Sequence, residues 1–141
     1  MYKDILLPVD LGDEGSFHKS VPVAMKLADA FGAQLHVMTV VPDYGMSIVG
    51  QFFPKPHEFN MMETARQRLH EFTESHMPGR KVQHIIAHGS VYQEILAMAK
   101  KIQADLIVMA SHRPGLEDYL LGPNASRVVR HGHCSVLVVR D

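Results

Sequence analysis

The sequence predicts an α/β protein, a three-layer sandwich in which a five-stranded, mostly parallel sheet carries helices on both faces. Short continuous apolar runs, typical of strands buried on both faces, alternate with segments whose apolar residues recur every three or four positions, as on one face of a helix. Strands separated by helices need crossover connections, so they pair in parallel. The length of 141 residues suits a single domain, which we expect to span residues 1–141.

The first strand and helix have clear boundary signals. An apolar run over residues 5–9 ends at Asp10, and polar and glycine residues follow. Apolar side chains then recur at helical spacing over residues 17–31. We expect Ser16 to cap this helix and Gly32 to end it. A proline within the first turns predicts an irregular or later start.

The rest of the chain continues the alternation. The further strands are expected at residues 35–41, 82–87, 106–110 and 135–139, and the further helices at 62–76, 91–102 and 124–130. Ser90 and Gln93 have capping-box spacing before the third helix. Residues 43–57 form a loop too long for an ordinary connection, so it is a lid over a ligand, a mobile insert or a flap that binds a partner.

Composition excludes several classes of protein. The 14 Lys+Arg and 15 Asp+Glu give a net charge of −1, which lacks the basic excess of a general nucleic-acid or anionic-membrane binder. No stretch approaches the ~20 apolar residues that cross a bilayer, and no signal-peptide core is visible, so we expect a cytoplasmic protein. The single cysteine, Cys134, excludes an intrachain disulfide. The ten histidines can shift the net charge in mild acid.

The residues that follow the strands are the first candidates for a ligand site. In open α/β sheets, ligands bind beyond the carboxyl ends of the strands, where the strand order reverses. Asp10 ends the first strand, and a carboxylate there can accept hydrogen bonds from ribose hydroxyls. The alternative role for Asp10 is a cap for the loop that follows.

The segment after the fourth strand is a candidate anion site. A loop leads to Gly122, which opens a helix whose N-terminal N–H groups attract phosphate. Gly122 permits close backbone approach, and Asn124 is a favourable N-cap residue. His112 and Arg113 can add cationic contacts, whereas Pro123 removes one N–H donor. The same pattern also fits an ordinary helix cap.

Two other groups of residues are weaker candidates for chemistry. His131, His133 and Cys134 have metal-binding side chains, but they lack the usual spacing of a metal site. Ser111 and His112 are adjacent in sequence, so their side chains diverge and do not make a nucleophile and base. No P-loop or nucleophile elbow is present. We therefore expect no metal site and no dedicated active site.

Several segments together resemble the universal stress protein family. They are Asp-Ile-Leu-Leu-Pro-Val-Asp at 4–10, Leu-His-Val at 35–37, His-Gly-Ser at 88–90, Asp-Leu-Ile-Val-Met-Ala-Ser-His at 105–112, Leu-Leu-Gly at 120–122 and Cys-Ser-Val-Leu-Val-Val-Arg at 134–140. The resemblance spans residues 2–141, and the segments that begin at 110 and 119 are similar to the F-type branch of single-domain members. Each motif is weak alone, but together they are specific.

This resemblance implies a Rossmann-like fold of the adenine nucleotide alpha hydrolase type, with ATP held between the first and fourth strands. AMP and ADP are alternative ligands, and Mg²⁺ is a candidate companion of the phosphates. The implied site residues are Asp10 and Gly89 near the ribose, the backbone of Val37 at the adenine, and Ala110, His112, Arg113, Gly122, Pro123 and Asn124 along the phosphates.

The phosphate loop departs from the family pattern Gly-x2-Gly-x9-Gly-Ser/Thr. Ala110 and Arg113 replace the first two glycines, Gly122 matches the third, Pro123 replaces the hydroxyl residue, and the loop is one residue shorter. Arg113 cannot adopt a positive φ cheaply, but its guanidinium is a candidate phosphate ligand. Pro123 lacks both a backbone donor and a hydroxyl. Weaker binding, or a shift toward AMP or ADP, is therefore expected.

The resemblance also implies a homodimer through the last strand, Ser135–Val139. An unpaired apolar edge strand is a liability that dimerisation removes, although a helix can also cover it. Three functions follow. The first is a dimeric stress-response protein that signals by nucleotide occupancy, with an unidentified regulatory partner. The second is a dimeric scaffold that no longer binds nucleotide. The third is a slow ATP hydrolase.

Overall fold

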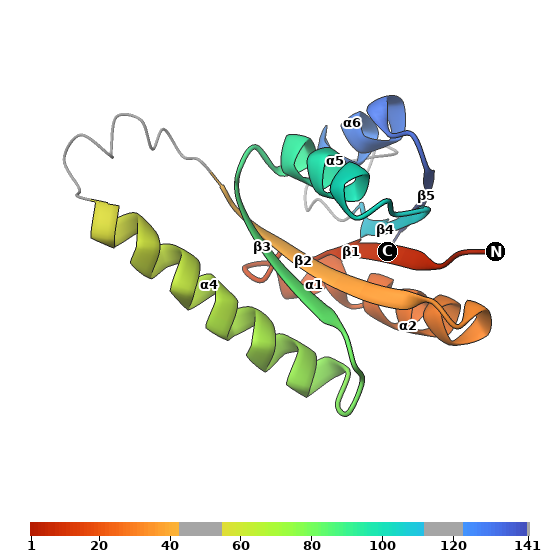
Figure 1. The fold of residues 1–141 in the computed structure, drawn as a ribbon, viewed down its shortest axis with the longest axis horizontal. Helices are drawn as coiled ribbons and strands as arrows, with labels where there is room; N and C mark the ends of the chain where they lie inside the picture. Colours follow the sequence, from red (N-terminus) through yellow and green to blue (C-terminus); the bar gives the residue numbers. More distant parts are fainter. Residues whose placement is uncertain (43–54, 112–122, 141) are drawn as a thin grey trace.

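A parallel sheet forms the centre of the fold in the computed structural model (Figure 1), which describes residues 1–42, 55–111 and 123–140. Its five strands have the order β3-β2-β1-β4-β5, and all four neighbouring pairs are parallel. The strands are β1 Asp4–Pro8, β2 Gln34–Pro42, β3 Gln83–Gly89, β4 Leu106–Ala110 and β5 Ser135–Val139. The predicted fold class is therefore confirmed.

Helices cover both faces of the sheet. The described helices are α1 Glu14–Phe17, α2 Ser20–Phe31, α4 Lys55–His76, α5 Val91–Lys101 and α6 Pro123–His131. α5 and α6 lie on one face, and α1, α2 and α4 lie on the other (Figure 1). None of these described helices combines the length and apolar character needed to cross a membrane.

The sheet separates two apolar clusters. Alternate residues of the central strand β1 enter opposite clusters, so Ile5 and Leu7 pack toward α2 and α4, and Leu6 packs toward α5 and α6. All three side chains are 0% exposed. Complete burial of such a side chain contributes about 1.5–3 kcal/mol. Burial on both faces explains why this strand is a continuous apolar run rather than an alternating one.

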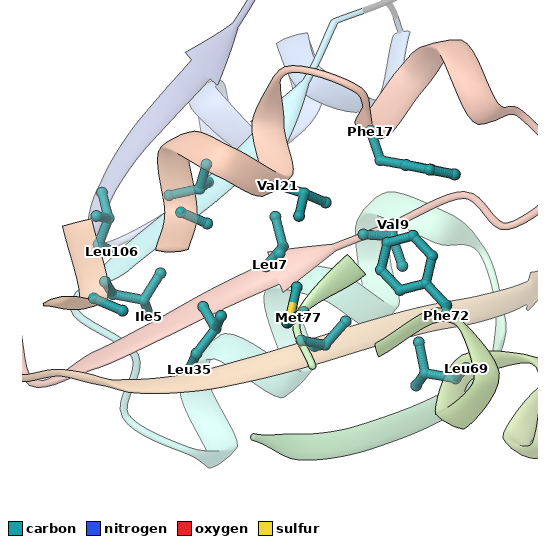
Figure 2. Packing of buried hydrophobic residues seen from close by; sticks show 14 residues of the cluster. Ile5, Leu7, Val9, Phe17, Val21, Leu35, Leu69, Phe72, Met77 and Leu106 are labelled. Carbon is teal, nitrogen blue, oxygen red and sulfur yellow. The ribbon is translucent and has the colours of Figure 1, made fainter. Parts of the chain in front are cut away.

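Aromatic side chains join α1 to α4 in the first cluster. The ring centroids of Phe17 and Phe72 lie 4.7 Å apart at 81°, an edge-to-face arrangement (Figure 2). Leu69 and Met77 extend the same cluster and are almost completely buried. The C-terminal half of α4 is therefore anchored to the core.

Most elements have the predicted boundaries, but the first helix is divided in two, and the helix predicted over residues 62–76 begins earlier, at Lys55. Residues 14–31 form two helices, α1 and α2, and Ser16 lies inside α1 rather than at a cap. Gly32 ends α2 as predicted, with a left-handed φ of 62° and its N–H bonded to the carbonyl of Ala28. Pro22 is the third residue of α2, where a helix does not need the missing N–H.

Two predicted caps and one loop boundary are also corrected. Ser90 occupies the N-cap position of α5, but its side chain makes no capping hydrogen bond. Asn124 is the second residue of α6 rather than its cap, because α6 begins at Pro123. The loop expected over residues 43–57 ends earlier, since α4 begins at Lys55, and residues 43–54 lie outside the described residues.

A pair of stacked histidines joins α4 to the edge strand β3. The rings of His70 and His84 are 3.7 Å apart and nearly parallel, at 15°. The Thr73 hydroxyl donates to the carbonyl of His70, so the Nε2–H of His84 donates to the Thr73 oxygen over 2.7 Å. Burial, and then the neighbouring His70, lower the pKa of His84. The neutral form of His84 is thus the form that the folded protein prefers.

We expect acidification from about pH 7.5 to 5.5 to destabilise the fold partly through His84. Because the pKa of His84 is lowered on folding, the unfolded chain takes up the proton first, below its ordinary pKa of ~6.5. The stability from neutral His84 is complete above that pH and is lost as the pH falls toward the lowered folded value. Urea unfolding should therefore show that acidification lowers the free energy of unfolding less in His84→Gln than in the wild type.

The exposed His18 supplies the matched control for this experiment. His18→Gln should retain the acid-induced loss of the wild type. If His84→Gln loses as much stability on acidification as the wild type, His84 is not a source of the pH dependence.

Candidate functional site

A cavity of about 870 Å³ opens at the carboxyl ends of the central strands. Its described walls come from the ends of β1, β2 and β4 and from α4, α5 and α6. The chain leaves β1 toward β2 on one side, and β4 lies on the other side, so the strand order reverses beside β1. The cavity thus lies where ligands bind in open α/β sheets, and its volume falls within the range of small-molecule sites.

Asp10 is held in a tight turn at this cavity. The N–H of Val9 donates to the carbonyl of Met38 over 2.8 Å, which extends the β1–β2 pairing to the residue before Asp10. The Asp10 Oδ1 accepts the N–H of Gly12 over 3.0 Å, and the Asp10 carbonyl accepts the N–H of Asp13 over 3.1 Å. Within the described chain the second carboxylate oxygen has no hydrogen-bond partner. Asp10 is exposed, so this oxygen can accept hydrogen bonds from a ligand.

The opposite wall combines the end of β4 with the start of α6. The N–H of Ser111 donates to the carbonyl of Val139 over 3.2 Å, which continues the β4–β5 pairing past Ala110. Pro123, Asn124 and Ala125 begin α6 and line the cavity. The first turn of a helix has N–H groups without intrahelical partners and a positive dipole end, both of which favour an anion. Pro123 removes one of those donors.

The structure brings four of the predicted site residues around the cavity: Asp10, Ala110, Pro123 and Asn124. Three others, His112, Arg113 and Gly122, lie outside the described residues.

Val37 and Gly89 lie apart from the cavity lining. Val37 is 0% exposed within the first apolar cluster, one residue before Met38, which does line the cavity. Gly89 ends β3 and is not among the described lining residues. The roles expected for these two residues stay predictions.

One wall of the cavity was missed by sequence reasoning. Asn60, Met61, Thr64, Ala65 and Arg68 of α4 line it. Their spacing places them along one side of the helix, next to the apolar side that contains Leu69 and Phe72. A polar helical stripe is typical of a solvated face, so only the packing of α4 shows that this one faces a cavity.

The structure describes all three residues that were considered for a metal in the sequence, His131, His133 and Cys134. In the described ranges, no group of three or more His, Cys, Asp and Glu side chains could hold an ion. Cys134 is half-buried and packs against the second apolar cluster. Burial, and then Asp105, raise the pKa of its thiol. The thiol therefore behaves as a small apolar group.

Gly89 has a backbone conformation that other residues rarely adopt. Its φ is +137°, and a Cβ there would lie 2.8 Å from the Glu94 Oε1. Glycine therefore permits the turn after β3 and leaves room for the Glu94 carboxylate.

The comparisons with known proteins agree on one family. The model of the Universal stress protein family matches residues 1–140. Universal stress protein G of Escherichia coli O157:H7 is 35% identical over 145 residues, which are 99% of this chain and 100% of that protein. Universal stress protein MJ0531 of Methanocaldococcus jannaschii is 31% identical over 152 residues, which are 99% of this chain and 83% of that protein.

Solved structures have the same fold. Hypothetical protein MJ0577 superposes with a TM-score of 0.75 at 27% identity and covers 100% of this chain and 97% of its own. Universal stress protein UspA from Lactobacillus plantarum has a TM-score of 0.71 at 25% identity, with 99% and 98% covered. A universal stress protein in complex with cAMP shares the fold at a TM-score of 0.62 and 20% identity, with 99% of this chain and 97% of that chain covered.

We expect Gly89→Ala to lower the free energy of unfolding by about 1–3 kcal/mol, because alanine is strained at this φ. Gly79→Ala is the matched control, since Gly79 has a φ of +75° and a Cβ added there would have no heavy atom within 4 Å. Its cost should be about 1 kcal/mol. Urea unfolding measures both variants, and equal losses would show that Gly89 has no special requirement.

Proposed function

The chain belongs to the universal stress protein family, and on this premise we propose that it binds an adenine nucleotide beside Asp10 and acts as a homodimeric regulator in the stress response. The observation that carries the proposal is the pairing of an open carboxylate oxygen on Asp10 with the start of α6 across one cavity. Such a pair suits the ribose and the phosphates of a nucleotide.

Each wall of the cavity supports one part of the ligand. A carboxylate accepts hydrogen bonds from the two ribose hydroxyls, as acidic residues at strand ends do in dinucleotide-binding folds. Backbone N–H groups at the start of α6 suit a phosphate. Apolar lining residues from β2 and α5, among them Met38 and Ile95, suit a base. The cAMP complex of a protein with this fold supports an adenine ligand.

ATP is the proposed ligand, with AMP and ADP as alternatives and Mg²⁺ as a companion of the phosphates. Ala110 and Pro123, two of the residues expected along the phosphates, line the cavity, and Pro123 supplies neither an N–H nor a hydroxyl. The same observation favours the second candidate function, a dimeric scaffold that no longer binds nucleotide.

The proposed dimer forms through β5. Among the described strands, β5 pairs with β4 alone and is therefore an edge of the sheet. Its side chain at Leu137 is 38% exposed. A twofold-related copy of β5 would cover that apolar side chain and pair the open backbone edge. We place this dimer in the cytoplasm, where nucleotide occupancy could be read by a regulatory protein.

We expect Asp10→Asn to weaken binding of both ATP and AMP by about tenfold or more, because hydrogen bonds to a charged acceptor are lost. Asparagine preserves the acceptor for the Gly12 N–H, so the turn should remain. Isothermal titration calorimetry measures the affinities, with Glu74→Gln, an exposed carboxylate on α4, as the control. Absence of binding to the wild type at millimolar ligand would overturn the proposal and favour the scaffold.

We expect Leu137→Glu to convert the dimer into monomers, because it places a charge on the exposed apolar side of the β5 edge. Sedimentation velocity measures the change. Val129→Glu is the control, since Val129 is an exposed apolar residue on α6 with 46% exposure. A monomeric wild type, or a Leu137→Glu variant that remains dimeric, would contradict an interface through β5.

A further inference from the structure

Arg68 brings a positive charge to the wall of the cavity that α4 forms. Among the described residues, the charged side chains that line the cavity are Asp10, Asp13 and Arg68. The guanidinium is therefore the one described cation in a lining that also holds two carboxylates. Within the described lining, a negatively charged ligand would find its cationic partner in Arg68.

The guanidinium extends from α4 to the turn that carries Asp10. Its Nη2 donates to the carbonyl of Leu11 over 3.1 Å. Leu11 lies between Asp10 and Gly12, whose N–H the Asp10 Oδ1 accepts. The charge of Arg68 is thus placed beside the proposed ribose end of the site.

Arg68 differs from its helical neighbour Arg66 in having no acidic partner among the described residues. Arg66 donates through Nε and Nη2 to the two carboxylate oxygens of Glu63, over 3.1 and 2.6 Å. No carboxylate in the part of the chain that the structure describes lies within 4.0 Å of the Arg68 nitrogens. A guanidinium has five N–H donors, and the bond to Leu11 is the one that it makes within the described ranges, so those residues leave the other donors to a ligand.

A guanidinium binds a phosphate group more strongly than it binds a hydroxyl group. The planar, forked donors of arginine match phosphate oxygens and form charge-assisted hydrogen bonds with them. Ribose hydroxyls accept hydrogen bonds from arginine without that gain. We propose, resting on the nucleotide site proposed above, that Arg68 is a specificity-determining residue that binds the phosphate attached to the ribose. The cavity then prefers a nucleoside phosphate over a nucleoside.

A role in positioning the turn is the competing explanation, because the bond to Leu11 also joins α4 to the Asp10 turn. The two roles differ in their ligand dependence. Loss of a phosphate contact weakens only phosphorylated ligands, whereas a displaced turn weakens every ligand that uses Asp10.

The test is calorimetric titration of the full chain with ATP, AMP and adenosine. Arg68→Met removes the charge and keeps a stem of similar length, Arg68→Lys keeps the charge without the fork, and Arg66→Met is the matched control on the same helix. Circular dichroism and thermal melting confirm that each variant is folded.

We expect Arg68→Met to bind both ATP and AMP about tenfold or more weakly than the wild type does. Its affinity for adenosine should change by less than about twofold. Arg68→Lys should recover part of the loss, and Arg66→Met should match the wild type. Equal effects on ATP and AMP are expected because both carry the phosphate next to the ribose.

Three results would overturn the assignment, and they are distinguishable. If the wild type binds ATP and adenosine equally tightly, the proposed adenine site stands, but the preference for phosphorylated ligands is wrong. Equal losses for all three ligands in Arg68→Met make Arg68 a positioning residue. A wild type that binds none of the ligands overturns the proposed function, and this inference with it.

Discussion

The structure depends on the central position of β1, which pairs in parallel with β2 on one side and β4 on the other. A strand with two neighbours and two covered faces must be apolar throughout, and Ile5, Leu6 and Leu7 are completely buried. β2 and β3 lie on one side of β1, and β4 and β5 lie on the other, so the strand order reverses beside β1. That reversal places Asp10 at the mouth of a cavity.

α4 connects this core to the candidate site. Leu69 and Phe72 anchor its C-terminal half in the first apolar cluster, and its preceding turns line the cavity as far as Arg68. The stacked pair of His70 and His84 lies between helix and edge strand in the same region. The contacts that hold α4 on the sheet therefore also determine where the charge of Arg68 lies relative to the Asp10 turn.

The strands and most of the helices could be predicted because apolar burial has a different period in each. The caps were harder. Ser16, Ser90 and Asn124 are all residue types that cap helices, yet none caps one here, either because the helix begins elsewhere or because the side chain makes no capping bond. A cap depends on where the chain enters a helix, and packing of the neighbouring elements sets that point.

Sequence alone determined the parallel sheet, the family resemblance and the placement of Asp10, Ala110 and the start of α6 at strand or helix ends, because each follows from local order along the chain. The tertiary structure decided which side of α4 faces the cavity, that Arg68 reaches the carbonyl of Leu11, and that Val37 lies in the core. These features join segments that are distant in sequence. Their positions are set by the docking of a helix on a sheet, which no local pattern encodes.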